Sequence, residues 1–224
     1  MRLTLAAWRP LKALLCALLA TCLAVPGVAQ AGAQAYEELS ASVRSSLQKA
    51  VSDQAVKETA FSDDQEQWAW LNEMSKRLEK RYPSPRERLD FLKTVHYEAR
   101  RAGLDPQLVL GVIEVESAFR KYAVSSVGAQ GFMQVMPFWT KEIGTSEHNL
   151  FHLRTNLRYG CTILRHYVDI EKGNLFRALG RYNGSLGKPE YPNLVLAAWK
   201  GKWALPTQVA GGGEAASLQI RAAR

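Results

Sequence analysis

Two glutamates, Glu114 and Glu116, lie two residues apart in VIEVESAFRKYAVSSVGAQGFMQVMP, which spans 112–137. Apolar residues precede Glu116 by seven, four and three positions, which places it on the apolar face of a helix predicted over 107–119. Burying a carboxylate is costly, so an apolar wall favours the neutral form and raises the carboxyl pKa. A carboxyl that stays protonated near neutral pH can act as a general acid.

A second interpretation of the same helix is structural. Arg120 follows Glu116 by four positions, which is the spacing of an ion pair on one helix face. Glu114 points about 200° away from Glu116 and shares a side with Leu110 and Gly111, which predicts partial burial. Periodicity alone leaves both the acid and the ion pair open, because structural ion pairs are common.

Proline and glycine divide the rest of the chain into short helices. Ser84-Pro85 and Asp105-Pro106 each read as an N-cap followed by proline at the first helical position. We find no sustained alternation typical of strands and no internal repeat, so the fold class is all-α. Besides 107–119, the predicted helices are 86–101, 132–139, 156–170, 175–182 and 190–200, with a loop at 125–131.

The ends of the chain have compositions of their own. The first residues combine a basic start, a short apolar run at 13–25 and small residues up to Ala31, the pattern of a secretory signal. The apolar run is shorter than the roughly 20 residues that span a bilayer. We therefore predict a signal peptide at 1–31, a helical N-terminal extension at 32–85, a compact domain at 86–204 and a flexible tail at 205–224.

Cysteine usage leaves one alternative for the N-terminus. The sequence LATC ends at Cys22 and is similar to a lipoprotein cleavage site, so a lipid-anchored form stands beside a freely soluble one. Cys16 lies in the predicted signal as well. Cys161 lies in an apolar helical pattern, and we interpret it as a small core residue.

Charge and motifs exclude several kinds of function. The net charge is +8, and it falls to +5 without the three basic residues of 1–35. A mildly basic chain suits an acidic polymer or an anionic envelope as a partner, although solubility alone would explain it. We find no basic cluster with interleaved aromatics for nucleic acid. His148 and His152 lack a third ligand for zinc, and no cofactor motif is visible.

Four sequence blocks carry a resemblance to a known family. They are ESAF at 116–119, SSVGAQGFMQVMP at 125–137, NLRYGCTIL at 156–164 and ALGRYNGS at 178–185. In this order and at this spacing they resemble the signature of lytic transglycosylases of the soluble, Slt type. That family belongs to the lysozyme-like superfamily and is close in fold to goose-type lysozymes. The resemblance implies a lysozyme-like helical domain, and the sequence pattern adds an N-terminal helical extension to it.

The resemblance also implies roles for individual residues. Glu116 is similar to the catalytic acid of the family, whereas Glu114 matches no functional position. Tyr182 is expected to face Glu116 and to orient it, or the acetamido group of the substrate, with its hydroxyl. The positions expected to bind the saccharide are Ser125, Gln134, Met136, Tyr182 and Asn183.

Some of these positions have simpler interpretations. Met133 and Met136 offer adaptable apolar contact to a sugar, or they pack in the core. Gly128 and Gly131 fit a tight turn that brings backbone near the groove, or serve turn geometry alone.

The activity implied by the resemblance is that of a peptidoglycan lytic transglycosylase, a carbon–oxygen lyase without metal or cofactor. It cleaves the β-1,4 bond between N-acetylmuramic acid and N-acetylglucosamine and leaves 1,6-anhydro ends. The resemblance implies that a single glutamate acts as acid and then as base. This agrees with the expectation that Asp105 is a helix cap and that Asp169, Glu171 and Glu190 are solvated, which leaves no evident second carboxylate.

Two alternatives remain open: a lysozyme-like muramidase, and a non-catalytic peptidoglycan-binding protein. The expected partners are glycan strands, with association to the membrane or to envelope proteins as an alternative. The expected location is the periplasm, reached across the inner membrane. The sequence predicts neither endo nor exo action, nor the oligomeric state, nor the role of 36–85.

Overall fold

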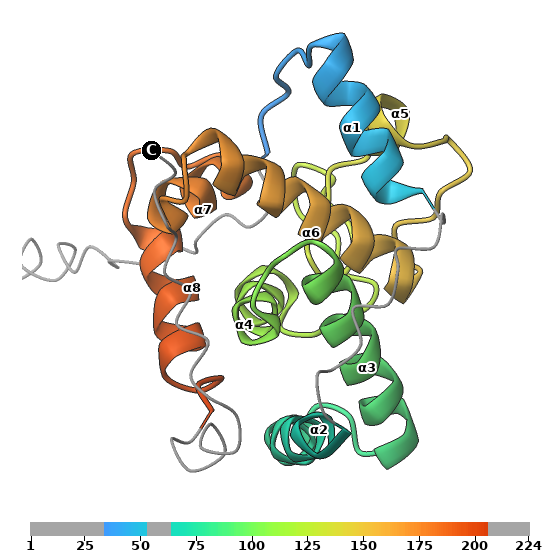
Figure 1. The fold of residues 1–224 in the computed structure, drawn as a ribbon, viewed down its shortest axis with the longest axis vertical. Helices are drawn as coiled ribbons and strands as arrows, with labels where there is room; N and C mark the ends of the chain where they lie inside the picture. The colour runs from blue at the N-terminus through green and yellow to red at the C-terminus, as the bar shows by residue number, and fades with distance from the viewer. Residues whose placement is uncertain (1–33, 53–63, 206–224) are drawn as a thin grey trace, which may run out of the picture.

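The computed structural model describes residues 34–52 and 64–205, and their arrangement is helical (Figure 1). Within these ranges the backbone forms eight α-helices and, in place of strands, two isolated bridges. The helices are α1 Ala41–Val51, α2 Asp64–Leu78, α3 Pro85–Arg101, α4 Pro106–Ser117, α5 Phe138–Ile143, α6 Leu153–Ile170, α7 Leu175–Asn183 and α8 Glu190–Lys200. The predicted signal and nearly all of the predicted tail lie outside the described residues.

Two predicted N-caps are confirmed. The side chain of Ser84 accepts a hydrogen bond from the backbone N–H of Glu87 at the start of α3. Asp105 Oδ1 accepts from the N–H of Gln107 at 2.7 Å, and its Oδ2 accepts from the indole N–H of Trp199 at 3.1 Å. Asp105 therefore caps α4 and also ties it to α8.

The helix predicted at 132–139 is wrong in most of its length. Residues 131–134 form a turn, and a helix begins only at Phe138. Gln134 adopts a φ of +48°, in the left-handed region, so a right-handed helix cannot run through it. Gln130 forms isolated bridges with Val124 and Val135, which fold the segment back on itself.

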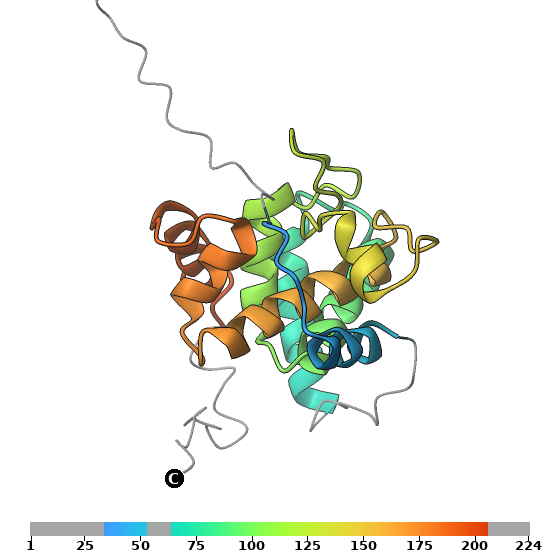
Figure 2. The same cartoon turned by 90° about the horizontal axis from the view of Figure 1, so that it is seen from above.

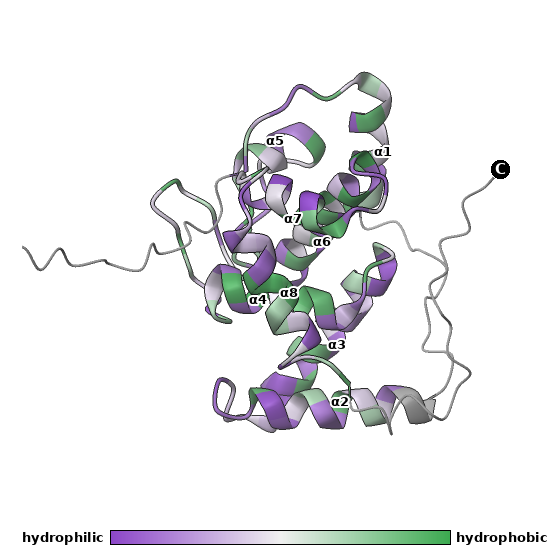
Figure 3. Ribbon diagram, turned by 90° about the vertical axis from the view of Figure 1, so that its left-hand side faces the viewer, coloured by the Kyte–Doolittle hydropathy of each residue, from purple (hydrophilic) through white to green (hydrophobic). Residues whose placement is uncertain are grey.

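Helix α4 lies in the middle of the molecule and is viewed nearly end-on in Figure 1. It packs against α8 on one side and α3 on the other. Four of its residues are completely buried: Val109, Leu110, Val112 and Ile113. A helix apolar around most of its circumference belongs in a core, and Figure 3 shows hydrophobic stretches of α4 and α8 meeting there.

The N-terminal helices share this core. Leu47 and Val51 of α1 are buried, as are four residues of α2: Trp70, Leu71, Met74 and Leu78. All of them belong to the cluster that contains the residues of α4. Residues 41–51 and 64–78 therefore brace the domain that follows them.

A buried ionic cluster fixes the end of α1. Glu98 on α3 is 1% exposed and accepts two hydrogen bonds from the guanidinium of Arg158 on α6, at 2.9 and 3.2 Å. Arg101 donates to the carbonyls of Ala50 and Ser52 at the C-terminal end of α1. These arginines join α1 to α3 and α6, because their buried charges require partners.

Candidate active site

The loop between α4 and α5 is held by three helices at once. The hydroxyl of Ser117 on α4 donates to the carbonyl of Phe132 at 2.7 Å. Asn156 Oδ1 on α6 accepts from the N–H of Met133 at 2.8 Å. The hydroxyl of Tyr182 on α7 donates to the Met133 carbonyl at 2.7 Å. The backbone of this loop is therefore fixed next to the C-terminal end of α4.

Asn156 makes further contacts with the loop. Its Nδ2 donates to the carbonyls of Gln130 and Leu150, both at 2.8 Å. A Cβ added to Gly131 would lie 2.4 Å from that nitrogen, and Gly131 has a φ of +75°. Glycine at this position is required both by the conformation and by the close approach of Asn156.

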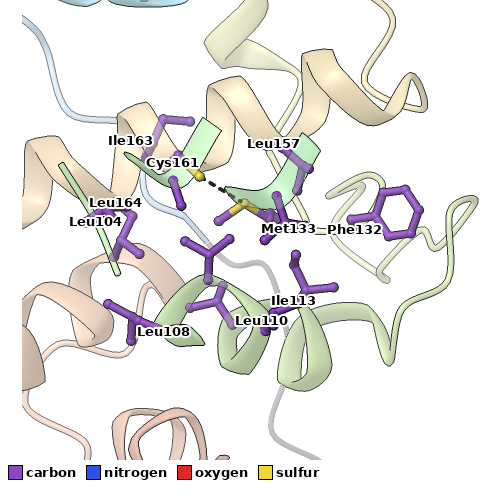
Figure 4. Packing of buried hydrophobic residues seen from close by; sticks show 14 of the residues in the cluster. Leu104, Leu108, Leu110, Ile113, Phe132, Met133, Leu157, Cys161, Ile163 and Leu164 are labelled. Atoms are coloured by element: carbon purple, nitrogen blue, oxygen red, sulfur yellow. Dashed lines mark hydrogen bonds between the residues drawn. The ribbon is translucent and has the colours of Figure 1, made fainter. Parts of the chain in front are cut away.

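Met133 is a core residue. Its side chain is completely buried, and a Cβ added to Gly160 of α6 would lie 2.4 Å from its sulfur. Cys161 packs beside it with the two sulfurs 4.0 Å apart, as Figure 4 shows. The core interpretations of Met133 and Cys161 are confirmed, whereas Met136 is only partly buried against the core.

Glu116 lies in the last turn of α4 with 5% of its surface exposed. Its Oε1 accepts a hydrogen bond from the hydroxyl of Tyr191 at 2.6 Å, and its Oε2 has no hydrogen-bond partner. Burial raises the pKa of Glu116 from 4.5 to about 8, and the hydrogen bond from Tyr191 opposes this rise in part. The carboxyl is therefore mainly neutral at pH 7.

The predicted ion pair between Glu116 and Arg120 does not form. Arg120 Nε donates to the carbonyl of Ser117 at 3.0 Å. Ala118 and Phe119 have φ values of +49° and +63°, so the chain leaves α4 in a left-handed conformation directly after Glu116. Such strained positions in non-glycine residues tend to occur at functional sites.

Glu114 has a structural role, as expected. Its Oε2 accepts from the indole N–H of Trp203 at 2.7 Å, and its Oε1 forms an ion pair with Lys202. These contacts tie α4 to the segment after α8, on a different side of the helix from Glu116.

Tyr191, at the start of α8, donates a hydrogen bond to Glu116, and the predicted role of Tyr182 in orienting this carboxyl stays a prediction. The hydroxyl of Tyr182 donates to the carbonyl of Met133, and the hydrogen bond to Glu116 comes from the hydroxyl of Tyr191. Tyr191 is 2% exposed. The sequence offered a weak signal for it, a tyrosine in the first turn of the last predicted helix, but no spacing related it to Glu116.

The other predicted saccharide-binding residues lie in or beside the same loop. Ser125 Oγ accepts from the N–H of Ala129 at 3.0 Å. Gln134 is 2% exposed, and its amide donates to the carbonyls of Ala123 and Gly131. Asn183 is buried at the end of α7. Ser125 and Gln134 thus have clear roles in shaping the loop, and their contact with a saccharide stays a prediction.

The acidic residues expected to be solvated differ from one another. Asp169 is exposed and pairs with Arg165, and Glu190 is exposed. The side chain of Glu171 is only 8% exposed and forms ion pairs with Arg177 and Arg181, so its expected solvation is wrong. In the described part of the chain, no carboxylate hydrogen-bonds to Glu116.

The two histidines that are four residues apart, His148 and His152, lie before α6. His148 Nδ1 lies 2.6 Å from the hydroxyl of Tyr159, and His152 precedes the first turn of α6. Among residues 34–52 and 64–205, no three His, Cys, Asp or Glu residues are grouped in a way that could hold a metal ion.

Comparison with known proteins places this geometry in a family. The profile of the family described as "Transglycosylase SLT domain" matches residues 93–191, from α3 through Glu116 to Tyr191. Residues 93–191 are therefore similar to the SLT domain of lytic transglycosylases. This domain is mostly helical, in agreement with the lysozyme-like fold class that the sequence predicts.

Several curated proteins are similar to this chain. A "Transglycosylase" of Enterobacteria phage PRD1 is 32% identical over 103 residues, which cover 46% of this chain and 38% of the phage protein. "Membrane-bound lytic murein transglycosylase C" of Actinobacillus pleuropneumoniae serotype 5b is 53% identical over 47 residues, 21% of this chain and 13% of the relative. The matches thus span well under half of the length of these curated relatives.

A solved structure is also similar. An inactive mutant of the lytic transglycosylase Slt from Pseudomonas aeruginosa is 26% identical, with a TM-score of 0.42. The match covers 55% of this chain and 22% of that protein. In the parts of our chain that the structure describes, no helix is long and apolar enough to span a bilayer.

Proposed function

We propose that this chain is a lytic transglycosylase that cleaves peptidoglycan glycan strands between N-acetylmuramic acid and N-acetylglucosamine and leaves 1,6-anhydro ends. The observation that carries the proposal is the Glu116 carboxyl, buried in an SLT domain and held neutral near pH 7 by its surroundings. The names of the curated relatives, a transglycosylase and a lytic murein transglycosylase, support the same activity.

In the proposed mechanism, Glu116 acts first as acid and then as base. The protonated carboxyl donates its proton to the glycosidic oxygen as the bond to the anomeric carbon breaks. The 2-acetamido group of the muramoyl residue supports the positive charge that develops. The carboxylate then removes the proton from the 6-hydroxyl of the same sugar, whose oxygen closes on the anomeric carbon. No water is consumed, and Glu116 is protonated again.

The hydrogen bonds of Glu116 fit this double role. Tyr191 holds Oε1, so Oε2 is the oxygen left to exchange a proton with the substrate. A pKa of about 8, which results mainly from burial, keeps the carboxyl a weak enough acid to recover its proton near pH 7. Because no second carboxylate hydrogen-bonds to Glu116 in the described residues, the acetamido group is the proposed source of further stabilisation.

We assign the remaining roles as part of the same proposal. The catalytic unit is 86–204, with 32–85 as its N-terminal brace. Its saccharide-binding residues are Ser125, Gln134, Met136, Tyr182 and Asn183. The proposed location is the cell envelope, which fits the secretory pattern of 1–31 and the "membrane-bound" name of one relative.

The direct test is to incubate the chain with purified peptidoglycan and to analyse the soluble products by mass spectrometry. Products with 1,6-anhydro ends, lighter than hydrolytic products by one water, are expected. Reducing ends would instead identify a muramidase. Binding without any product would make the chain a peptidoglycan-binding protein and would contradict the proposal.

Replacing Tyr191 by phenylalanine is expected to lower kcat about tenfold, because the carboxyl of Glu116 loses the hydrogen bond that orients it. The pH profile should shift as well. The acid works below the pKa of Glu116 and fails above it, and the hydrogen bond from Tyr191 lowers that pKa. Its loss therefore moves the alkaline limb of kcat/KM to higher pH. The measurement is the rate of muropeptide release between pH 5 and 10.

Tyr97→Phe is the matched control for Tyr191→Phe. The side chain of Tyr97 is 37% exposed on α3, so removal of its hydroxyl should leave both rate and pH profile unchanged. An unshifted alkaline limb in Tyr191→Phe would show that Tyr191 does not act on the carboxyl of Glu116.

A further inference from the structure

The side chain of Gln34 is buried beside the proposed saccharide-binding loop. It is 4% exposed, although it precedes the first helix of the described residues. Its Oε1 accepts from the indole N–H of Trp139 at 3.0 Å and from the N–H of Met136 at 3.3 Å. Its Nε2 donates to the carbonyl of Gln134 at 3.5 Å. Both the oxygen and the nitrogen of the Gln34 amide therefore form hydrogen bonds.

The groups around Gln34 form a binding site for an amide. Two N–H donors meet its oxygen and one carbonyl meets its nitrogen, and an acetamido group of a sugar carries the same C=O and N–H. Two of these groups belong to Gln134 and Met136, which are proposed to bind saccharide. Tyr182, also a proposed binding residue, hydrogen-bonds to the Gln34 side chain and interacts electrostatically with Glu116.

Gln34 belongs to the extended segment 34–40, here called the strap, which crosses the molecule to reach α1 (Figure 2). Glu37 forms an ion pair with Arg181 at 3.1 Å, next to Tyr182 on α7. Tyr36 contacts the ring of Phe138 edge-on, with centroids 5.6 Å apart. The strap therefore joins α7 to the start of α5 above the loop.

The strap is held more weakly than the helix behind it. Tyr36 is 57% exposed, and the side chain of Glu37 is 51% exposed, so its ion pair is screened by water. Helix α1 is anchored by buried Leu47 and Val51 and by the ion pair of Arg44 with Glu142 at 3.0 Å. These contacts hold α1 independently of the exposed residues of the strap.

We propose that the strap is an intramolecular competitor of the substrate, in which the Gln34 amide occupies the position that a sugar acetamido group takes when a glycan binds. Trp139 is then a further specificity-determining residue. Its indole N–H donates to the amide oxygen of Gln34 in the free chain and to the acetamido oxygen of the sugar when a glycan is bound. The inference rests on the proposed function, since it concerns the same saccharide-binding residues. When the strap occupies this site, the apparent affinity for the substrate is reduced in proportion to the fraction of molecules in which the site is open.

The test in turnover compares the full chain with Gln34→Ala. The peptidoglycan concentration at half-maximal rate is expected to fall about fivefold in the variant, with kcat within twofold of the parent. Glu38→Gln, a change at an exposed residue of the same strap, is the control and should behave as the parent. An unchanged half-saturating concentration in Gln34→Ala, with the parent active, would contradict the proposed competition by the strap. It would not contradict the proposed function.

A second measurement does not depend on activity. In a Glu116→Gln background, tetra-N-acetylglucosamine is titrated calorimetrically into chains with Gln34 or Gln34→Ala, after thermal melts show both to be folded. About fivefold tighter binding by the Gln34→Ala chain is expected. Equal or weaker binding, or no binding by either chain, would overturn the inference. If no variant turns over peptidoglycan, the proposed function fails, and this comparison still decides whether the strap competes.

Discussion

Glu116→Gln is expected to reduce the release of anhydromuropeptides about 10³-fold while the chain remains folded. Glutamine can still accept the hydrogen bond of Tyr191, but it has no proton to donate to the glycosidic oxygen. The loss should appear in kcat, because the substitution removes proton transfer and leaves the volume of the site unchanged. The measurement is the initial rate on purified peptidoglycan, followed by mass spectrometry.

Glu114→Gln is the matched control, since it makes the same change two residues earlier on the same helix. Glutamine retains an acceptor for the indole N–H of Trp203 and loses only the partly exposed ion pair with Lys202. Its activity is expected to stay within twofold of the parent. Parent-like activity in Glu116→Gln would show that another group is the acid.

Glu116→Gln also has an expected effect on stability. The pKa of Glu116 rises from 4.5 to about 8 on folding, chiefly through burial, so the folded state holds this proton more tightly than the unfolded state. The parent therefore loses stability as the pH rises through this interval, and the glutamine variant does not. The difference in free energy of unfolding should grow by about 3 kcal/mol in favour of the variant between pH 5 and 8. Urea titrations at both pH values measure it.

Asn156→Ala is expected to cost about 4 kcal/mol of folding stability and to abolish activity. Asn156 is completely buried, and its loss leaves the Met133 N–H and the carbonyls of Gln130 and Leu150 without their side-chain partner. Each unsatisfied buried group costs about 1–3 kcal/mol, and water entering the cavity recovers part of this. Equilibrium unfolding in urea gives the magnitude.

Asn193→Ala on α8 separates this effect from helix propensity. Asn193 is exposed, and the same substitution there should change stability by less than about 0.5 kcal/mol. A loss below 1 kcal/mol in Asn156→Ala would mean that the loop is held by its other contacts, from Ser117 and Tyr182.

The features predicted well from the sequence are local ones. Caps at Ser84 and Asp105 follow from short-range backbone chemistry, and most helix boundaries follow from proline and glycine. The burial of Glu116 follows from apolar residues at helical spacing before it. The helical periodicity of apolar residues is enough to predict on which face of its own helix one side chain lies.

Features that depend on distant segments could not be predicted in this way. Tyr191 lies 75 residues from Glu116, and its hydrogen bond exists only because α8 packs against α4. Gln34 meets Trp139 across 105 residues. The left-handed conformation of Gln134, which prevents a helix at 132–139, is stabilised by hydrogen bonds from its amide to two loop carbonyls rather than by its own propensity.

The hydrogen bonds of Arg101 to the C-terminal carbonyls of α1 define a pivot. With α1 fixed, rotation of the preceding chain is confined to the residues before Ser40, which caps the helix. At about 3.4 Å per residue, the six residue steps from Ser40 to Gln34 span roughly 20 Å when fully extended. Gln34 is therefore tethered within a sphere of that radius, and its local concentration at the groove stays high whatever the concentration of the protein.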